Sequence, residues 1–142
     1  MKSIGILLCL VSTLAFGDTL KAPKDARVLA DKMVKSFVKT EFKEGLDLAK
    51  PYWPLNQVEV DGLANQISTQ WPLVDQRFGK STGYEFVQEE RIGNSFIRYY
   101  YVHKFQNHAI YWQLTFYKPE DSWLVNGVTF KDNLDILFQV VE

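Results

Sequence analysis

The spacing of apolar residues changes near Gly79, and this change constrains the fold more than any other feature of the sequence. Before Gly79, apolar residues recur every three or four positions, which is typical of helices that bury one face. After Gly83 they alternate with polar residues, as in strands whose sheet buries a single face. Helices followed by antiparallel strands predict an α+β domain, in which the helices cover one side of a curved sheet.

The first half of the chain predicts a long amphipathic helix that follows a polar segment around Pro23. We expect this helix to end near Glu44 and Gly45, because glycine readily adopts the left-handed conformation that closes many helices. Lysines occupy the opposite side of the helix. Its apolar face comprises Leu29, Met33, Val34, Phe37, Val38 and Phe42.

A short helical turn over residues 46–50 should stop at residues 51–54, because the two prolines in that segment lack the amide hydrogen that a helix needs. A second long helix is predicted over residues 59–79, with Asp61 as its N-cap. Pro72 is expected to kink or divide this helix.

Alternation in the second half predicts an antiparallel sheet whose strands follow one another along the chain. Asn126 and Gly127 indicate a β-bulge in the last strand. The C-terminal segment, residues 134–140, is typical either of a short edge strand or of a frayed helix. The predicted strands cover residues 84–92, 95–105, 109–117 and 123–130.

The N-terminus has the three parts of a cleavable secretory signal. A lysine near the start precedes an apolar run over residues 4–14, and Ala15 and Gly17 place small residues before a cut. We predict a signal peptide over residues 1–17 and a single mature domain over residues 18–142. The alternative is a retained anchor, but the run is shorter than the roughly 20 apolar residues that span a bilayer. No stable membrane insertion is therefore expected after cleavage.

The position of the single cysteine helps to predict the cellular compartment of the protein. The single cysteine, Cys9, lies inside the predicted signal, so the mature chain has no thiol for a disulfide, a nucleophile or a thiolate metal site. Small secreted domains of animals are usually cross-linked by disulfides, whereas this chain is not. Secretion into a bacterial periplasm is therefore the predicted localisation.

Charge and motifs argue against several classes of function. The net charge is −1 and no basic stripe is present, so nucleic acid is not an expected partner. The two histidines, His103 and His108, occupy a strand and a turn, an arrangement that does not suit a metal site. The sequence has no phosphate-binding glycine loop, dinucleotide fingerprint or serine-nucleophile motif. We predict neither a metal nor a cofactor.

Three local patterns carry a family resemblance: the long N-terminal helix, the turn from Gly45 to Pro51, and the strand over residues 123–130 after an acidic turn. With them the chain resembles the cone-shaped α+β superfamily named after nuclear transport factor 2, and residues 71–79 look similar to small exported bacterial members of unassigned function. The resemblance implies a sheet wrapped around helices, an open pocket at the wide end and frequent dimerisation through the outer sheet face. That superfamily holds ketosteroid isomerases, dehydratases and binding modules, so fold does not select a function.

Strand parity places a histidine and several aromatic residues on the face that should meet the helices. We interpret them as the lining of a pocket that binds a small apolar or aromatic ligand without catalysis, with Asp132 near its mouth. The alternative is an isomerase or dehydratase in which His103 and a tyrosine transfer a proton, because burial tunes such groups toward neutral pKa. A third interpretation is a core histidine with one hydrogen bond. The predicted ligand-binding residues are Tyr99, Tyr101, His103, Trp112 and Phe116.

The opposite sheet face is unusually rich in tyrosine. We predict a homodimer through this face, or attachment to another protein of the cell envelope, because aromatic patches favour interfaces. The alternative is a solvated sheet face, where tyrosine is tolerated. The predicted interface residues are Tyr100, Val102, Tyr111, Gln113 and Tyr117. Thr115 lies on the same predicted face.

Overall fold

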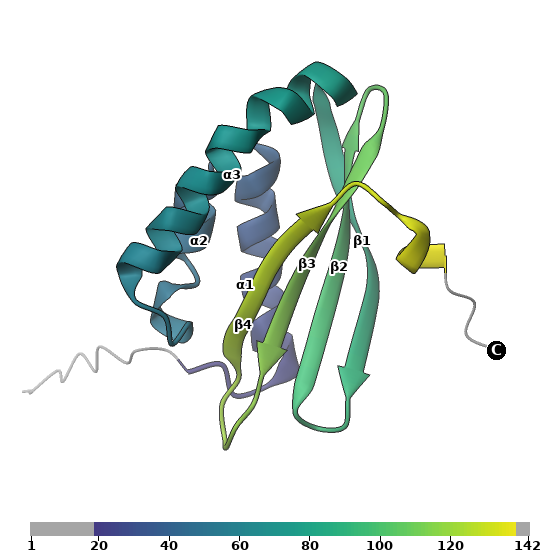
Figure 1. Ribbon diagram of the computed structural model, residues 1–142. Helices are drawn as coiled ribbons and strands as arrows, with labels where there is room; N and C mark the ends of the chain where they lie inside the picture. The colour runs from purple at the N-terminus through teal and green to yellow at the C-terminus, as the bar shows by residue number, and fades with distance from the viewer. Residues whose placement is uncertain (1–18, 139–142) are drawn as a thin grey trace, which may run out of the picture.

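Three α-helices precede a four-stranded antiparallel sheet in the computed structural model, which describes residues 19–138 (Figure 1). The α+β fold predicted from the apolar spacing is confirmed. The helices lie on one side of a curved, open sheet in which each strand pairs with its neighbour in the chain. Residues 1–18, which include the predicted signal, and residues 139–142 lie outside the described part. The elements are α1 (Pro23–Val38), α2 (Phe42–Asp47), the 3-10 turn η1 (Lys50–Tyr52), α3 (Gln57–Phe78), β1 (Ser81–Ile92), β2 (Phe96–Phe105), β3 (Ala109–Tyr117), β4 (Leu124–Lys131) and the 3-10 turn η2 (Asp135–Phe138).

Helix α1 ends earlier than predicted. Its C-terminal turn closes at Thr40, which has φ of 62°, and the N–H of Glu41 donates to the carbonyl oxygen of Ser36 at 3.0 Å. This is the Schellman pattern, in which a single left-handed residue ends a helix. Threonine takes the position that glycine usually occupies, and the chain re-enters a short helix, α2.

Gly45 lies inside α2 and does not cap a helix, which corrects the prediction made for it. A Cβ atom at this position would lie 2.6 Å from Cε1 of Phe37 and 3.1 Å from the carbonyl oxygen of Met33. Both atoms belong to α1. The missing side chain of Gly45 therefore lets α2 pack directly against α1.

Helix α3 begins after Asn56, whose Oδ1 accepts a hydrogen bond from the N–H of Val58 at 2.9 Å. Asp61 is therefore not the N-cap; it accepts a hydrogen bond from Nζ of Lys50 at 2.7 Å and so ties η1 to α3. Pro72 lies within α3 and does not divide it. Within the described residues, no helix is long and apolar enough to cross a membrane.

The strands lie where alternation predicts them, although β1 begins earlier. The predicted bulge in β4 is confirmed: Thr115 pairs with Gly127 and Phe116 pairs with Val125, which leaves Asn126 as an extra residue. The C-terminal segment forms η2 and not an edge strand.

A second bulge, in β1, is not evident from the sequence pattern. Val87 is an extra residue between two consecutive pairs of β1 with β2. Because an extra residue shifts the alternation by one, the side chains beyond it change face. Glu89 and Arg91 accordingly pair with Tyr99 and Ile97, two residues of the buried core.

Aromatic rings fill the space between the helices and the sheet. The ring centroid of Phe37 lies 4.5 Å from that of Trp112, and the centroid of Phe42 lies 4.6 Å from that of Trp71. Trp71 and Trp112 stack with centroids 6.1 Å apart. These rings come from α1, α2, α3 and β3, so one cluster joins the helices to the sheet. We refer to these four rings as the aromatic cluster.

The close contact at Gly45 yields a stability prediction. Replacing Gly45 by Ala should destabilise the protein by about 1–3 kcal/mol, because the new methyl group overlaps the ring of Phe37. Gly62→Ala is the matched control, since Gly62 also lies in a helix but has no atom within 4 Å of the place that its new methyl group would take. That control should be neutral or stabilising by up to about 1 kcal/mol. Urea unfolding of both variants measures the difference, and equal stabilities would contradict the packing role.

Candidate functional site

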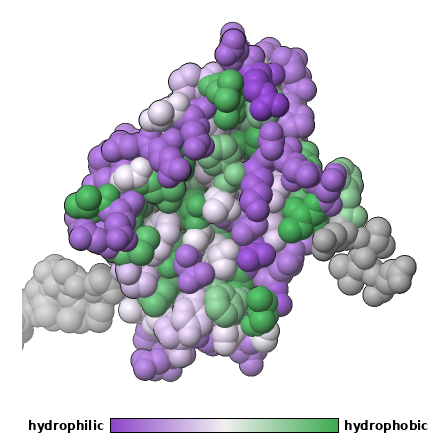
Figure 2. All heavy atoms as spheres, viewed as in Figure 1, coloured by the Kyte–Doolittle hydropathy of each residue, from purple (hydrophilic) through white to green (hydrophobic). Residues whose placement is uncertain are grey.

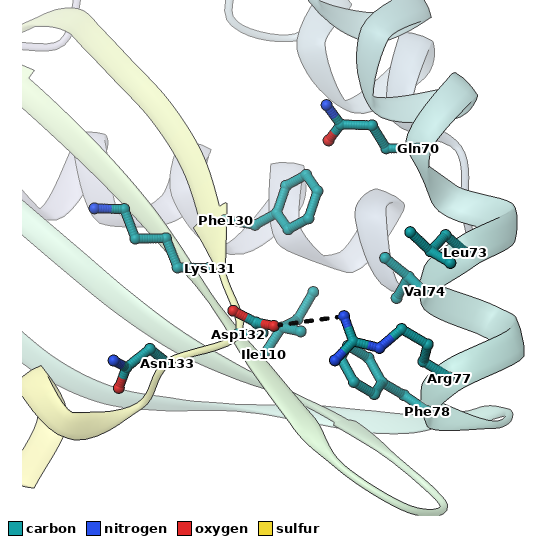
Figure 3. A pocket seen from close by; sticks show the side chains of 10 residues that line it. All are labelled: Gln70, Leu73, Val74, Arg77, Phe78, Ile110, Phe130, Lys131, Asp132 and Asn133. Carbon is teal, nitrogen blue, oxygen red and sulfur yellow. Dashed lines mark ion pairs between the residues drawn. The ribbon is translucent and has the colours of Figure 1, made fainter.

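A pocket of about 390 Å³ lies between the C-terminal half of α3 and the end of β4 (Figure 3). We refer to it as the α3–β4 pocket. Its walls come from segments far apart in the sequence, which meet because α3 runs beside the edge strand of the sheet (Figure 1). The residues that line it are Gln70, Leu73, Val74, Arg77, Phe78, Ile110, Phe130, Lys131, Asp132 and Asn133.

The local structure explains why these side chains converge. Gln70, Leu73, Val74 and Arg77 are spaced by three or four residues, so they share one face of α3. On the opposite wall, Asp132 follows β4 and lies at the mouth of the pocket. The sequence placed this carboxylate at the mouth of a different, inner pocket, so its role there stays a prediction.

The floor of the α3–β4 pocket is apolar. Phe78 and Ile110 are buried, and Val74 and Phe130 are partly buried beside them. Viewed from the same side as Figure 1, the surface shows apolar side chains between α3 and the sheet, with hydrophilic side chains on both borders (Figure 2). The pocket therefore offers apolar contact area that is open to a ligand.

The rim of this pocket is charged. Nη1 of Arg77 lies 3.9 Å from Oδ2 of Asp132, and the two side chains are 58% and 55% exposed. Figure 3 shows this pair across the opening, whereas the side chain of Lys131, at the end of β4, points away from it. Exposed ion pairs at this distance contribute little to stability, so Arg77 is free to exchange Asp132 for another anion.

The five predicted ligand-binding residues lie together in the core. Each of them is at most 2% exposed, and none is among the described residues that line the α3–β4 pocket. The three helix rings of the aromatic cluster, Phe37, Phe42 and Trp71, pack against Trp112 from the helix side. The structure thus brings these residues together as packed side chains, and a ligand site formed by them stays a prediction.

Both ring nitrogens of His103 are engaged. Nε1–H of Trp112 donates to Nδ1 of His103 at 3.2 Å, and Nε2 of His103 lies 2.8 Å from Oγ of Ser81. Because Nδ1 accepts, the neutral ring carries its proton on Nε2 and donates to the serine. Burial lowers the pKa of His103 from 6.5 to about 4, so the ring is neutral near pH 7.

The two buried tyrosines of β2 bind α1 through their hydroxyl groups. The hydroxyl of Tyr99 donates to the carbonyl oxygen of Pro23 at 2.9 Å, and that of Tyr101 donates to Oδ1 of Asp31. Burial raises the pKa of Tyr99 to about 12, and burial together with the hydrogen bond to Asp31 also raises the pKa of Tyr101. Both phenols are therefore neutral donors that hold the sheet against α1.

The predicted interface residues divide into two groups. Tyr100 and Tyr111 are already buried within the chain, with ring centroids 5.9 Å apart, while Val102, Gln113 and Tyr117 are partly exposed. Dimerisation through this face stays a prediction.

Metal binding finds no ready site in the described residues. Within residues 19–138, no group of three or more His, Cys, Asp or Glu side chains is placed to hold a metal ion.

Comparisons with protein-family models, with curated proteins and with solved structures found no match.

The burial of His103 predicts an acid-dependent loss of stability. The unfolded chain binds a proton at this residue near pH 6.5, whereas the folded chain does so only near pH 4. Between these values the unfolded state holds more protons, so stability should fall as the pH decreases, by about 3 kcal/mol in total. Urea unfolding of the wild type and of His103→Gln across this range should show the loss in the wild type alone.

His108→Gln serves as the control for this experiment, because His108 is exposed. It should keep the pH dependence of the wild type. An NMR titration of the His103 ring in the folded protein is an independent check, since a midpoint above pH 6 would contradict a sealed neutral ring.

Proposed function

We propose that this protein is an exported, non-catalytic domain that binds a small ligand with an apolar body and an acidic group in the α3–β4 pocket. The observation that carries the proposal is the combination of an open pocket of about 390 Å³, an apolar floor and an exposed arginine at the rim, which lies 3.9 Å from an exposed carboxylate. Sites for small molecules usually measure about 300–1,000 Å³ and combine apolar walls with a few polar groups. Export rests on the sequence pattern of residues 1–17.

The floor determines what kind of ligand body fits. Val74, Phe78, Ile110 and Phe130 present aliphatic and aromatic carbon from both walls. Burying apolar ligand area against them is worth about 25 cal/mol per Å². An aromatic or aliphatic body of modest size fits this floor.

The rim determines what kind of head group fits. Arg77 supplies a positive charge at the opening, and its acidic partner among the described lining residues is the exposed Asp132. The ammonium group of Lys131 points away from the pocket (Figure 3). An arginine side chain binds a carboxylate or sulfonate through paired hydrogen bonds, which an incoming acidic group obtains by displacing Asp132. Gln70 and Asn133 add neutral hydrogen-bonding groups at the opening.

The non-catalytic part of the proposal rests on what the pocket lacks. The only carboxylate among its described lining residues is the exposed Asp132, and no histidine lines it. The alternative function, proton transfer by His103 and a tyrosine, requires a substrate to reach a fully buried ring whose two nitrogens are already bonded. Membership of the nuclear transport factor 2 superfamily is compatible with a binding role and is not needed for it.

The proposal is tested with a probe of matching chemistry, 1-anilinonaphthalene-8-sulfonate, whose fluorescence reports transfer to an apolar site. Arg77→Gln should weaken binding about fivefold, because one exposed charge contact is worth up to about 1 kcal/mol. Asp132→Asn should strengthen binding by a similar factor, since it removes the competing carboxylate. Lys35→Gln, which removes an exposed positive charge on α1, should leave the affinity unchanged.

A neutral relative of the probe, N-phenyl-1-naphthylamine, separates the floor from the rim. It should bind more weakly than the sulfonate and should not respond to Arg77→Gln. Val74→Trp, which fills the pocket, should reduce the binding of both probes. Unchanged affinity of the sulfonate in Arg77→Gln, Asp132→Asn and Val74→Trp together would refute the assignment of the site.

A further inference from the structure

A second pocket, of about 200 Å³, lies at the opposite end of the strands from the α3–β4 pocket. It is formed where α1 begins, beside the β1–β2 hairpin and the connection that leads into β4 (Figure 1). We refer to it as the basal pocket. Its lining residues are Lys21, Pro23, Arg91, Gly93, Asn94, Ile97, Lys118 and Trp123.

We propose that the basal pocket binds a small oxyanion, of the kind carried by a phosphate or carboxylate group. Three of its lining residues are basic, and none of the described lining residues is acidic. Cations held close together repel one another, and an anion between them removes that repulsion. This site is separate from the α3–β4 pocket and does not depend on the function proposed there.

Arg91 reaches the basal pocket because of the bulge at Val87. With regular alternation after Phe86, the side chain of Glu90 would share the helix-facing side of β1. The extra residue instead places Arg91 opposite Ile97, which lines the same pocket. Arg91 forms an ion pair with Glu89, whose Oε1 lies 3.1 Å from Nη2 of Arg91. The arginine side chain is nevertheless 53% exposed.

The two lysines are held in place by backbone pairing. The N–H of Lys118 donates to the carbonyl oxygen of Ser95 at 2.8 Å, and its Nζ lies 5.3 Å from the ring centroid of Trp123. Lys21 follows Leu20, whose carbonyl oxygen accepts a hydrogen bond from the N–H of Trp123 at 2.7 Å. Three segments distant in sequence therefore bring their positive charges to one opening.

Trp123 forms part of the wall of the basal pocket. The residue is 3% exposed, and its indole N–H has no hydrogen-bond partner among the described residues. Leaving a buried donor unpaired is unfavourable, and such groups call for an explanation. Because the ring of Trp123 lines the basal pocket and lies beside Lys118, its indole N–H is a sensitive reporter of an anion bound there.

The volume limits the ligand. A space of about 200 Å³ accommodates one phosphate or carboxylate group with a short attachment. The anion can be a free small molecule or the head group of an anionic lipid, and both use the same contacts with Arg91 and the lysines. The experiment therefore includes one arm for each source.

The first arm titrates the full mature protein with inorganic phosphate at constant ionic strength and records ¹H–¹⁵N NMR spectra. The indole signal of Trp123 should shift and saturate. The indole of Trp71 is the internal reference, because it is also buried without a partner but belongs to the core and does not line the basal pocket. Trp123→Phe assigns the signal.

Arg91→Gln should weaken phosphate binding at least fivefold without unfolding the protein, since the side chain is half exposed. Lys131→Gln is the matched control: it removes the same charge from the α3–β4 pocket and should leave phosphate binding unchanged. The second arm sediments the protein with vesicles of phosphatidylcholine containing phosphatidylglycerol. If the protein sediments with the vesicles, and both added phosphate and Arg91→Gln reduce this sedimentation, the ligand is a lipid head group. If the protein binds phosphate but does not sediment with the vesicles, the ligand is a free anion.

A Trp123 signal that does not saturate, or an equal phosphate affinity in Arg91→Gln and the wild type, would overturn the proposal. Loss of probe binding at the α3–β4 pocket would not affect it, because the two sites share no lining residue among those described.

Discussion

The contact between the helices and the sheet depends on a single constraint: the aromatic cluster must fit between them. Phe37, Phe42 and Trp71 come from three successive helices, and Trp112 comes from the centre of the sheet. The ring centroids of neighbouring members of the cluster lie 4.5 to 6.2 Å apart. Large rings bury much area per residue and lose little rotamer freedom, so a chain of this length obtains a firm core from few side chains. Gly45 completes this arrangement, because α2 can deliver Phe42 only if its backbone lies directly on α1.

This packing also determines where the protein can bind anything. The interior, where a cone-shaped fold would hold a ligand, is occupied by side chains. His103 is already bonded to Ser81 and Trp112, and Tyr101 to Asp31, while the indole N–H of Trp71 has no partner among the described residues. The two pockets described above lie at the two ends of the strands. One end meets α3 and has a mixed apolar and charged lining, while the other meets the start of α1 and is basic. A filled core and two terminal pockets are thus parts of one arrangement.

The sequence predicted the elements better than their junctions. The alternation of apolar and polar residues located the four strands and predicted that Tyr99, Tyr101 and His103 share the buried face. A sheet that buries one face requires an apolar residue at every second position of each strand. The end of α1 was missed, since a left-handed threonine at position 40 carries no such signal, and glycine nearby was used for close approach instead. The candidate site was hardly predictable: Leu73 and Arg77 resemble the solvent side of a helix until β4 lies beside them. Whether facing side chains leave a cavity depends on how their volumes interlock in three dimensions, which a pattern of spacing does not contain.

The extra residue in β1 has a consequence for how this fold can diverge. Charged side chains alternate along the end of that strand, and Val87 determines which of them faces inward. Deleting Val87 would remove the bulge and restore regular alternation, yet Glu89 would still pair with Tyr99 and Arg91 with Ile97. The bulge therefore absorbs the loss of one residue, whereas the same loss from a regular part of the strand would turn every later side chain to the other face. Among descendants of such a chain, a single-codon deletion at this point would preserve the charges at that end of the sheet, and the bulge marks where the strand tolerates a change of length.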